Sequence, residues 1–373
     1  MADDTLTITG FEIVPVLVTL VREFRGSHYR MTNRATVIVR VQTAEGIVGE
    51  AYAGDEDKTL HELVHVIRDE IAPRLVGANA LAYERCWELA FPVTFDILRD
   101  RRIGLVALAA VDFAIWDAIG KSLGRPLWQL WGGYRDRMPV SIIGGYYDPD
   151  PGAIAAELAE WRELGFRACK FKVGGASPAE DARRVERLRE AAGDDFTIMI
   201  DANQGYTVAQ ALDLCGRIRD LGIRWFEEPC LWPNDRRDMR DVRYRGGIPV
   251  CAGQTEVSPE GCRDLMEIGA IDVCNFDASW SGGYTAWKRV AALCAVNGVD
   301  VAHHEEPQVS LHMLASQPRG TFVECFHPDR DPFWWNIIAN RPAIVDGEIE
   351  APRGPGLGWE LDAEYVEHHR ADR

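Results

Sequence analysis

The stretch ACKFKVGG, residues 168–175, places two lysines two positions apart in a short apolar run that ends in glycines. Residues two apart on a β-strand point to the same side, so Lys170 and Lys172 are expected to face one way from a predicted strand. Burying an unpaired ammonium group costs free energy. The rest of the chain is therefore expected to supply acidic partners for the two lysines.

Seven further strand-like runs accompany this one, and amphipathic helical stretches separate most of them. The runs are VSIIGGYY (140–147), FTIMIDA (196–202), RWFEEP (224–229), IPVCAGQ (248–254), DVCNFDA (272–278), VDVAHHE (299–305) and GTFVECF (320–326). Eight strands with helical crossovers predict an α/β fold, a parallel TIM-like barrel over residues 136–327. An open doubly wound sheet is the alternative, but no G-x-G-x-x-G motif follows the first strand.

The first third of the chain has a different pattern. FEIVPVLVTL (11–20) and ATVIVRVQTAEGIVGEAYAG (35–54) are rich in β-branched residues, and the TAEG turn within the second predicts an antiparallel sheet. Helical patterns follow at 60–75, 81–90 and 104–124, the last ending at Gly124 and Pro126. Residues 1–135 are therefore predicted to form a separate α+β domain.

Composition narrows the class of protein. The net charge of −17 disfavours non-specific binding to nucleic acid or to an anionic membrane. Nine scattered cysteines without a C-x-x-C pair indicate reduced core thiols. The first residues, MADDTLTITG, lack the basic region and following apolar stretch of a secretory signal peptide. No uninterrupted apolar run approaches the roughly 18 residues of a membrane span. We expect a cytoplasmic protein with no nucleic-acid or membrane partner.

Polar side chains stand at the carboxyl end of the predicted strands. They are Lys170, Lys172, Asp201, Glu227, Gln254, Asp277, His304 and Glu324. From Asp201 onward they are spaced 20 to 27 residues apart, about one βα unit each. Strand ends of a (β/α) barrel meet at one mouth, where catalytic groups lie. These side chains are therefore expected to converge.

The acidic members of this set predict a metal site. Asp201 and Glu227 are hard oxygen ligands at neighbouring strand ends, a donor set that suits Mg²⁺. Either one alone is more typical of a helix N-cap or a surface carboxylate, but the matched pair favours the metal. Glu228, one residue on, is expected to point away and to be structural.

The basic members predict acid–base chemistry. Crowding and partial burial are expected to lower the pKa of Lys172 toward that of a useful base, although a lysine reaching from a strand edge to solvent is the alternative. His304 is expected to hydrogen-bond Asp277, which would fix its tautomer. The two sides would flank a substrate from opposite walls. The implied reaction is removal of a proton next to a carboxylate, with a metal stabilising the anion.

Together these motifs resemble the mandelate racemase-like branch of the enolase superfamily, whose reactions follow this pattern. The similar stretches are ALAAVDFAIWDAIGKSLGRPLWQLWGG, ACKFKVGG, DANQGYT, FEEP, NFDASWSGG, HHEEPQVSLHMLAS, VECF and GPGLGWELD, in that order along nearly the whole chain. The resemblance implies a (β/α)7β barrel under an α+β capping domain, with residues 328–373 returning to that domain.

The resemblance also implies roles for single residues. Lys172 would be one base, Lys170 would contact the substrate carboxylate and lower the pKa of Lys172, and His304 with Asp277 would be the opposite acid or base. Glu324 would hydrogen-bond a carboxylate oxygen, and Asn203 follows the first metal ligand as a substrate-binding residue. The capping loop, residues 21–34, carries Arg22, Arg25, His28, Arg30 and Arg34, which favour a polar, anionic substrate; a surface charge cluster is an equal alternative.

One position departs from the family pattern. The third metal ligand is usually a glutamate, but here AGQTE places Gln254 there. An amide oxygen can ligate Mg²⁺, as in a nearby branch resembling glucarate dehydratases; alternatively Glu256, two residues on, replaces it. A lost carboxylate would weaken the metal site, so a non-catalytic ligand-binding protein stays open.

Two reactions fit the predicted site. The first is dehydration of a sugar acid, an aldonate or aldarate, to a 2-keto-3-deoxy acid. The second is racemisation or epimerisation of a 2-hydroxy acid by the same two bases. The resemblance further implies an even-numbered homo-oligomer.

Overall fold

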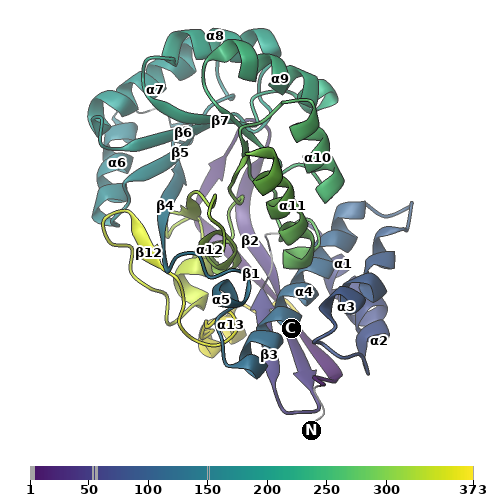
Figure 1. Cartoon of the computed structure of the whole chain (residues 1–373). Coiled ribbons are helices and arrows are strands. Elements are labelled where there is room, and N and C mark those ends of the chain that lie inside the picture. Colours follow the sequence, from purple (N-terminus) through teal and green to yellow (C-terminus); the bar gives the residue numbers. More distant parts are fainter. Residues whose placement is uncertain (1–4, 53, 55–57, 149, 151, 373) are drawn as a thin grey trace.

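The structure, a computed structural model, describes residues 5–372 apart from residues 53, 55–57, 149 and 151. A curled parallel sheet is surrounded by helices, and a separate antiparallel sheet with its own helices covers one side of it (Figure 1). This arrangement confirms the predicted fold class, a TIM-like barrel with an α+β capping domain.

All eight predicted barrel strands are present and parallel, in the order β10-β9-β8-β7-β6-β5-β4-β11. They are β4 (Arg137–Gly144), β5 (Ala168–Lys172), β6 (Thr197–Asp201), β7 (Ile223–Glu227), β8 (Val250–Ala252), β9 (Val273–Cys274), β10 (Asp300–Val301) and β11 (Val323–Phe326). Backbone hydrogen bonds join Val301 to Arg319 and Thr321, just before β11, so the sheet curls round to meet itself.

Helices on the outside connect these strands. They are α6 (Ala153–Glu163), α7 (Pro178–Ala192), α8 (Val208–Ile218), the short η3 (Trp232–Asn234) with α9 (Asp235–Gly246), α10 (Pro259–Glu267), α11 (Gly283–Asn297) and α12 (Pro307–Ala315). Helix α7 begins at Ser177, whose side chain accepts a hydrogen bond from the Glu180 backbone amide as an N-cap. Such short crossovers hold the strands parallel and in register.

The barrel interior explains why the lysines face the same point. Ala168, Met199 and Trp225, from β5, β6 and β7, pack together in one buried apolar cluster. Because side chains alternate along a strand, the residues two positions later face the same interior. Lys170 and Asp201, two positions after Ala168 and Met199, therefore lie above this apolar layer.

The cap consists of an antiparallel sheet and a set of helices. The strands are β1 (Ile8–Arg25), β2 (Arg30–Thr43) and β3 (Val48–Tyr52). The helical segments are α1 (Leu60–His65), η1 (Val66–Ile71), α2 (Ala72–Leu75), α3 (Tyr83–Ala90), η2 (Phe91–Thr94), α4 (Arg101–Leu123) and α5 (Leu127–Leu130). The turn between β1 and β2 carries the predicted capping loop toward the barrel mouth.

Helix α4 joins the cap to the barrel. The carboxylate of Asp112 accepts hydrogen bonds from the backbone amide and the hydroxyl of Thr285, in α11 of the barrel. Asp117 accepts from the backbone amides of Glu50 in β3 and Leu357 near the C-terminus. In the described part of the chain, α4 alone is long and apolar enough to cross a bilayer, but its apolar stretch is wholly buried inside the protein, as in a core helix.

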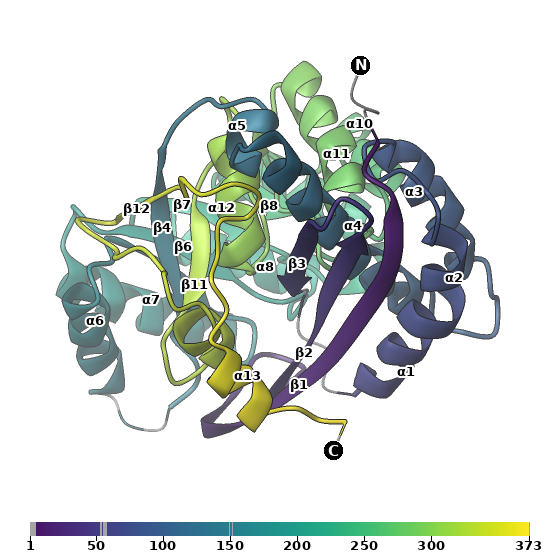
Figure 2. The same ribbon diagram turned by 90° about the horizontal axis from the view of Figure 1, so that it is seen from below.

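The last segment runs back along the molecule. It contains η4 (Phe333–Ile337), β12 (Glu348–Glu350), which pairs antiparallel with β4, and α13 (Ala363–His368). The backbone amide of Leu17 donates to His369, and that of Ala371 donates to Pro15, so the chain beyond α13 lies along β1 (Figure 2). The domain boundaries at 135 and 327 stay a proposal. The nine cysteines are all buried and free, as predicted.

Candidate active site

Three carboxylates are the acidic partners of the two lysines. Both ammonium groups are buried. The Nζ atom of Lys170 donates to Glu227 Oε1 and to Glu324 Oε2, each at 2.8 Å. The Nζ atom of Lys172 donates to Asp201 Oδ2 at 2.6 Å. Residues from four strands, β5, β6, β7 and β11, thus meet inside the barrel.

Strand register accounts for this convergence. Lys172 pairs with Asp201 across β5 and β6, and Asp201 pairs with Glu227 across β6 and β7. In parallel strands, residues at the same register level stand side by side, about 4.8 Å apart. The sequence spacing of one βα unit therefore corresponds to lateral neighbours in the sheet.

The acid–base state of Lys172 differs from the expectation. Burial alone lowers the pKa of a lysine, but the adjacent Asp201 carboxylate outweighs it, so the pKa of Lys172 is raised above its ordinary value. For Lys170, burial is likewise outweighed by Glu227 and Glu324, and its pKa is also raised. The predicted lowering of the Lys172 pKa is wrong for this arrangement, because the direct ion pair dominates over the second lysine.

The pKa values of the two candidate metal ligands, Asp201 and Glu227, are shifted in opposite directions. Burial and the lysines act against each other at Asp201, and Lys172 and Lys170 hold its pKa below the ordinary value. At Glu227, burial, reinforced by Asp201 and Glu324, raises the pKa well above the ordinary value despite Lys170. Lys170 Nζ lies 3.8 Å from Asp201 and 2.8 Å from Glu227, so one cationic group reaches both. The carboxylate oxygens of Asp201 and Glu227 are hard ligands of the kind that Mg²⁺ prefers, so these two residues fit a magnesium site.

The residues around Asp201 and Glu227 hold them in place. The Asn203 backbone amide and side-chain amide both donate to Asp201. Glu228 is buried, accepts from the Gly253 backbone amide, and has its pKa raised to about 8, first by burial. It hydrogen-bonds the β8 side rather than the lysines, which agrees with a structural role.

The two candidates for a third metal ligand have different surroundings. Gln254 is buried, and its Oε1 atom accepts from the Asn275 side chain at 3.1 Å. Glu256 forms a two-pronged ion pair with Arg236 of α9, at 2.6 and 2.7 Å. Across the described residues, no three His, Cys, Asp or Glu side chains are grouped to hold a metal ion. A third protein ligand of another type, such as the Gln254 amide, is compatible with that finding.

The predicted dyad forms on the other side. His304 Nδ1 lies 2.9 Å from Asp277 Oδ2, and both side chains are buried. Asp277 Oδ1 accepts from the backbone amide and hydroxyl of Ser279, which fixes the carboxylate. The indole of Trp280 packs on the His304 ring at 4.7 Å. The second nitrogen of His304, Nε2, lies on the other side of the ring from Asp277.

Glu305 is a site residue that sequence reasoning missed. Its Oε1 atom lies 3.3 Å from His304 Nε2, and its Oε2 atom lies 3.6 Å from Arg34 Nη1 in β2. Its backbone amide donates to Glu324 Oε2, the oxygen that also accepts from Lys170. Glu305 thereby connects the lysine side of the site to the histidine side. The only sequence signal was its position directly after the predicted histidine.

The tip of the β1–β2 turn covers the barrel mouth. Ser27 donates its hydroxyl to the Asn203 backbone carbonyl at 3.1 Å, and Lys172 Nζ lies 6.0 Å from the centre of the Tyr29 ring. The predicted capping loop therefore reaches the site, although of its basic residues only Arg34 is buried beside it. The cap and the barrel build the site together.

Comparisons with known proteins agree with this geometry. The model of the mandelate racemase / muconate lactonizing enzyme N-terminal domain matches residues 9–132, and that of the enolase C-terminal domain-like family matches residues 153–366. The chain is 31% identical to D-galactarolactone cycloisomerase of Agrobacterium fabrum, covering 93% of this chain and 94% of that one. It is 28% identical to arabinonate dehydratase of Saccharolobus solfataricus, covering 90% of each chain.

A solved structure extends the likeness to the full fold. The crystal structure of a mandelate racemase/muconate lactonizing enzyme from a marine actinobacterium, in complex with magnesium, is 58% identical. It superposes with a TM-score of 0.94 over 98% of this chain and 100% of that one. The chain belongs to the mandelate racemase/muconate lactonizing enzyme family of the enolase superfamily.

Proposed function

We propose that this protein removes the proton next to the carboxylate of a sugar acid and expels the β-hydroxyl group, giving a 2-keto-3-deoxy acid. The observation that carries the proposal is the buried polar network that runs from Lys172 through Asp201, Lys170, Glu324 and Glu305 to His304. It supplies an acid or base on each side of one space. The arabinonate dehydratase relative supports dehydration as the reaction type.

The lysine side would receive the proton. Asp201, Glu227 and Gln254 would hold Mg²⁺, the ion found in the related crystal structure. When bound, the ion would stabilise the negative charge that develops on the substrate carboxylate. Lys170 and Glu324 would contact the carboxylate oxygens, and Lys172, in its neutral amine form, would take the proton from the α-carbon on Nζ. Glu256 is the weaker candidate for a ligand, because Arg236 already pairs with it.

The histidine side would act as the acid. Asp277 on Nδ1 and Glu305 near Nε2 place a carboxylate at each ring nitrogen of His304. An imidazolium can give its proton to a departing hydroxyl group. In dehydration this group only has to give up a proton, whereas in racemisation it must also take one up.

Racemisation or epimerisation of a 2-hydroxy acid is the second candidate. It is favoured by one observation, the presence of a titratable group with its own partner on each side of the site, Lys172 with Asp201 and His304 with Asp277. A protein that binds such acids without turnover is the third candidate, since Gln254 replaces a carboxylate. A homo-oligomeric state and a cytoplasmic location remain predictions.

One assay separates these candidates. The purified protein is incubated with Mg²⁺ and a panel of aldonic and aldaric acids in deuterated water. Formation of a 2-keto-3-deoxy acid supports dehydration, exchange at the α-carbon without keto acid supports racemisation, and neither supports binding alone. We expect keto acid with at least one sugar acid, and we expect exhaustive chelation to abolish its formation; full activity after chelation would exclude the metal site.

A further inference from the structure

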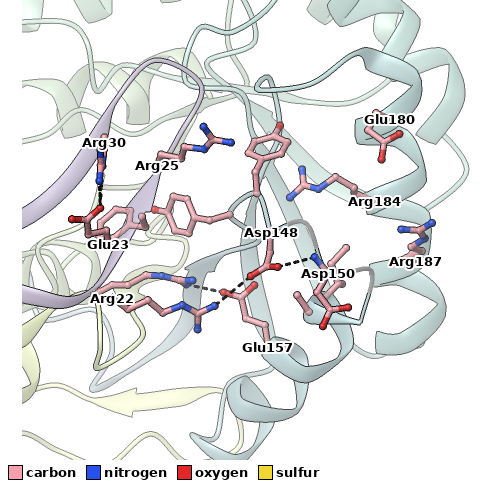
Figure 3. Close-up of a pocket in the computed structure, with 16 residues that line it drawn as sticks. Arg22, Glu23, Arg25, Arg30, Asp148, Asp150, Glu157, Glu180, Arg184 and Arg187 are labelled. Carbon is pink, nitrogen blue, oxygen red and sulfur yellow. Dashed lines mark hydrogen bonds and ion pairs between the residues drawn. The ribbon is translucent and has the colours of Figure 1, made fainter.

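A second cavity lies beside the predicted active site. It has a volume of about 600 Å³ and lies between the β1–β2 turn, the loop after β4, and helices α6 and α7 (Figure 3). Arg22, Arg25 and Arg30 of the capping loop line it, whereas none of the predicted strand-end residues does. Its walls include six arginines: Arg22, Arg25, Arg30, Arg184, Arg187 and Arg330.

Aromatic side chains form one wall of this cavity. Phe24 packs on Tyr146 at 4.8 Å and on Phe326 at 5.7 Å, and the Arg330 guanidinium lies 4.7 Å from the Tyr146 ring. Phe24 and Tyr146 are buried members of a small apolar cluster of their own. The cavity therefore lies next to the active site and shares the β1–β2 turn with it.

Most acidic side chains at the cavity are already neutralised. Glu23 pairs with Arg30, Glu157 with Arg330, and Glu180 with Arg183. Asp148 faces Arg22 at 3.9 Å, and Asp150 accepts from the Gly152 backbone amide at the start of α6. These pairs leave little negative charge to oppose an incoming anion.

Two of the arginines are left over. Within the described part of the chain, no carboxylate forms an ion pair with Arg25 or with Arg187. Arg25 extends from the β1–β2 turn, and Arg184 extends toward it from α7, with Arg187 one helical turn further along (Figure 3). Arginine presents a planar fork of donors that matches carboxylate and phosphate oxygens.

The two buried arginines of the cavity are both paired with carboxylates. Arg184 and Arg330 are each less than a tenth exposed, so water screens their charges only weakly. The Arg184 guanidinium donates hydrogen bonds to two backbone carbonyls, that of Lys172 at 2.9 Å and that of Gly145. It also forms an ion pair with Asp181 at 2.8 Å. Arg25 and Arg187 are therefore the arginines at this cavity that can attract an anion.

We propose that this cavity binds a small molecule with two or more carboxylate or phosphate groups, gripped by Arg25 from the cap and Arg187 from the barrel. Such a ligand bridges the two parts of the chain. Arg184 lies at the cavity and holds the backbone carbonyl of Lys172, so a ligand there contacts an element that positions the proposed base. The binding does not depend on turnover, so its test is independent of the proposed function.

The test measures binding to the full chain by calorimetry, with tricarballylate and with inorganic phosphate as separate probes at low salt. At least one probe is expected to bind, and the binding is expected to weaken as NaCl is added. Arg25→Ala and Arg187→Ala are each expected to weaken it about tenfold or more, the worth of a charge-assisted contact. Arg74→Ala is the matched control, because Arg74 is an exposed arginine of α2 outside the cavity. The two probes distinguish a carboxylate from a phosphate ligand.

Three results would overturn the proposal. They are no binding of either probe, equal binding by wild type and the Arg25→Ala/Arg187→Ala double variant, and loss of probe binding in Lys172→Ala. The last would move the probe into the barrel mouth. Unchanged thermal unfolding of the double variant in the absence of probe verifies that its fold is intact.

Discussion

Lys172 and Lys170 have the same side-chain chemistry but different partners, and the partners decide what each can do. Lys172 has one close carboxylate, Asp201, whereas Lys170 has two, Glu227 and Glu324. An ammonium shared between two buried carboxylates is held more tightly in its charged form than one with a single partner. Lys172 is therefore the more suitable lysine to release and take up a proton.

Lys172 and His304 are proposed to act in different steps, so removing each one should have a different effect. We expect Lys172→Ala to abolish both keto-acid formation and α-carbon exchange. His304→Asn should lower keto-acid formation by about 10²- to 10⁴-fold, the usual worth of a general acid or base, while exchange by Lys172 continues. Rates of both processes, followed by NMR in deuterated water, test this. Full activity in both variants would refute the two-sided scheme.

Glu305 should influence the acid step through His304. In Glu305→Gln, keto-acid formation is expected to fall about tenfold while exchange at the α-carbon stays near the wild-type rate, because only the histidine side loses a charge. A purely structural role for Glu305 would lower both rates in parallel. Glu305→Asp should recover part of the loss.

The neighbouring Glu306 offers a matched control for that experiment. Glu306 is buried, and burial raises its pKa well above the ordinary value. Its side chain accepts from Gln308 rather than contacting His304. Glu306→Gln replaces a carboxyl group whose charged form is disfavoured by burial with an amide of the same shape, so both rates should stay close to wild type. A tenfold loss there would point to general disturbance of the loop.

The position of the Glu305 side chain could not be predicted from the sequence. Glu305 and Glu306 both adopt left-handed backbone conformations, with φ of 52° and 51°. Non-glycine residues adopt this conformation rarely, and no glycine or asparagine marks the turn in HHEEP. The strand-end residues were predictable because periodicity and βα spacing are local properties. The direction of the Glu305 side chain depends on a turn that the surrounding fold imposes.

At the level of elements, the cap relies on a close approach of β3 to α4. A Cβ atom on Gly49 would lie 2.0 Å from the Ala114 backbone oxygen and 2.7 Å from the Ala118 backbone nitrogen. Both are atoms of the helix backbone and cannot turn aside as a flexible side chain can. Only a residue without a side chain permits this packing distance.

Gly49→Ala should therefore destabilise the protein by about 3 kcal/mol, the upper range for overpacking of a core. Gly216→Ala is the opposite case. Gly216 is exposed in the interior of α8, only the end of Arg219 lies near its Cβ position, and alanine favours the helix by about 0.5–1 kcal/mol. Chemical denaturation of both variants tests the pair. A neutral Gly49→Ala would mean that α4 adjusts freely.

Sequence patterns located the elements well but not their contacts. The predicted helix at 60–75 is present as three consecutive segments, α1, η1 and α2, and the predicted strands of the barrel are all present. The pairing of β12 with β4 has no local signal, because EIE at 348–350 is short and lies far from its partner. Long-range pairing depends on where the finished barrel leaves an edge.

On the scale of the whole molecule, the protonation of Asp112 affects stability, because this carboxyl group lies where the cap contacts the barrel. Burial raises its pKa to about 7, and its hydrogen bonds to Thr285 offset only part of that rise. In the unfolded chain the carboxyl titrates near pH 3.9. Between about pH 4 and pH 7 the folded protein therefore binds more protons than the unfolded chain.

It follows that Asp112 makes the free energy of unfolding fall as the pH rises from 4 to 7, by on the order of 3 kcal/mol. Asp112→Asn lacks this titration, so the stability difference between wild type and variant should change across that range, in favour of the variant at higher pH. Urea denaturation at several pH values measures it. The Asp69→Asn difference should stay flat from pH 4 to 7, because Arg68 lowers the pKa of Asp69 to about 2. A flat Asp112 difference would contradict the raised pKa.

The pairing of residues 369 and 371 with β1 bears on how the chain is made. Leu17 and His369 lie about 350 positions apart in the sequence, yet a backbone hydrogen bond joins them. A ribosome that adds some ten residues per second exposes β1 roughly half a minute before the segment with residues 369 and 371 emerges. During that interval β1 presents an unpaired edge that another nascent chain can join, so the early cap is the part of this protein most in need of a chaperone.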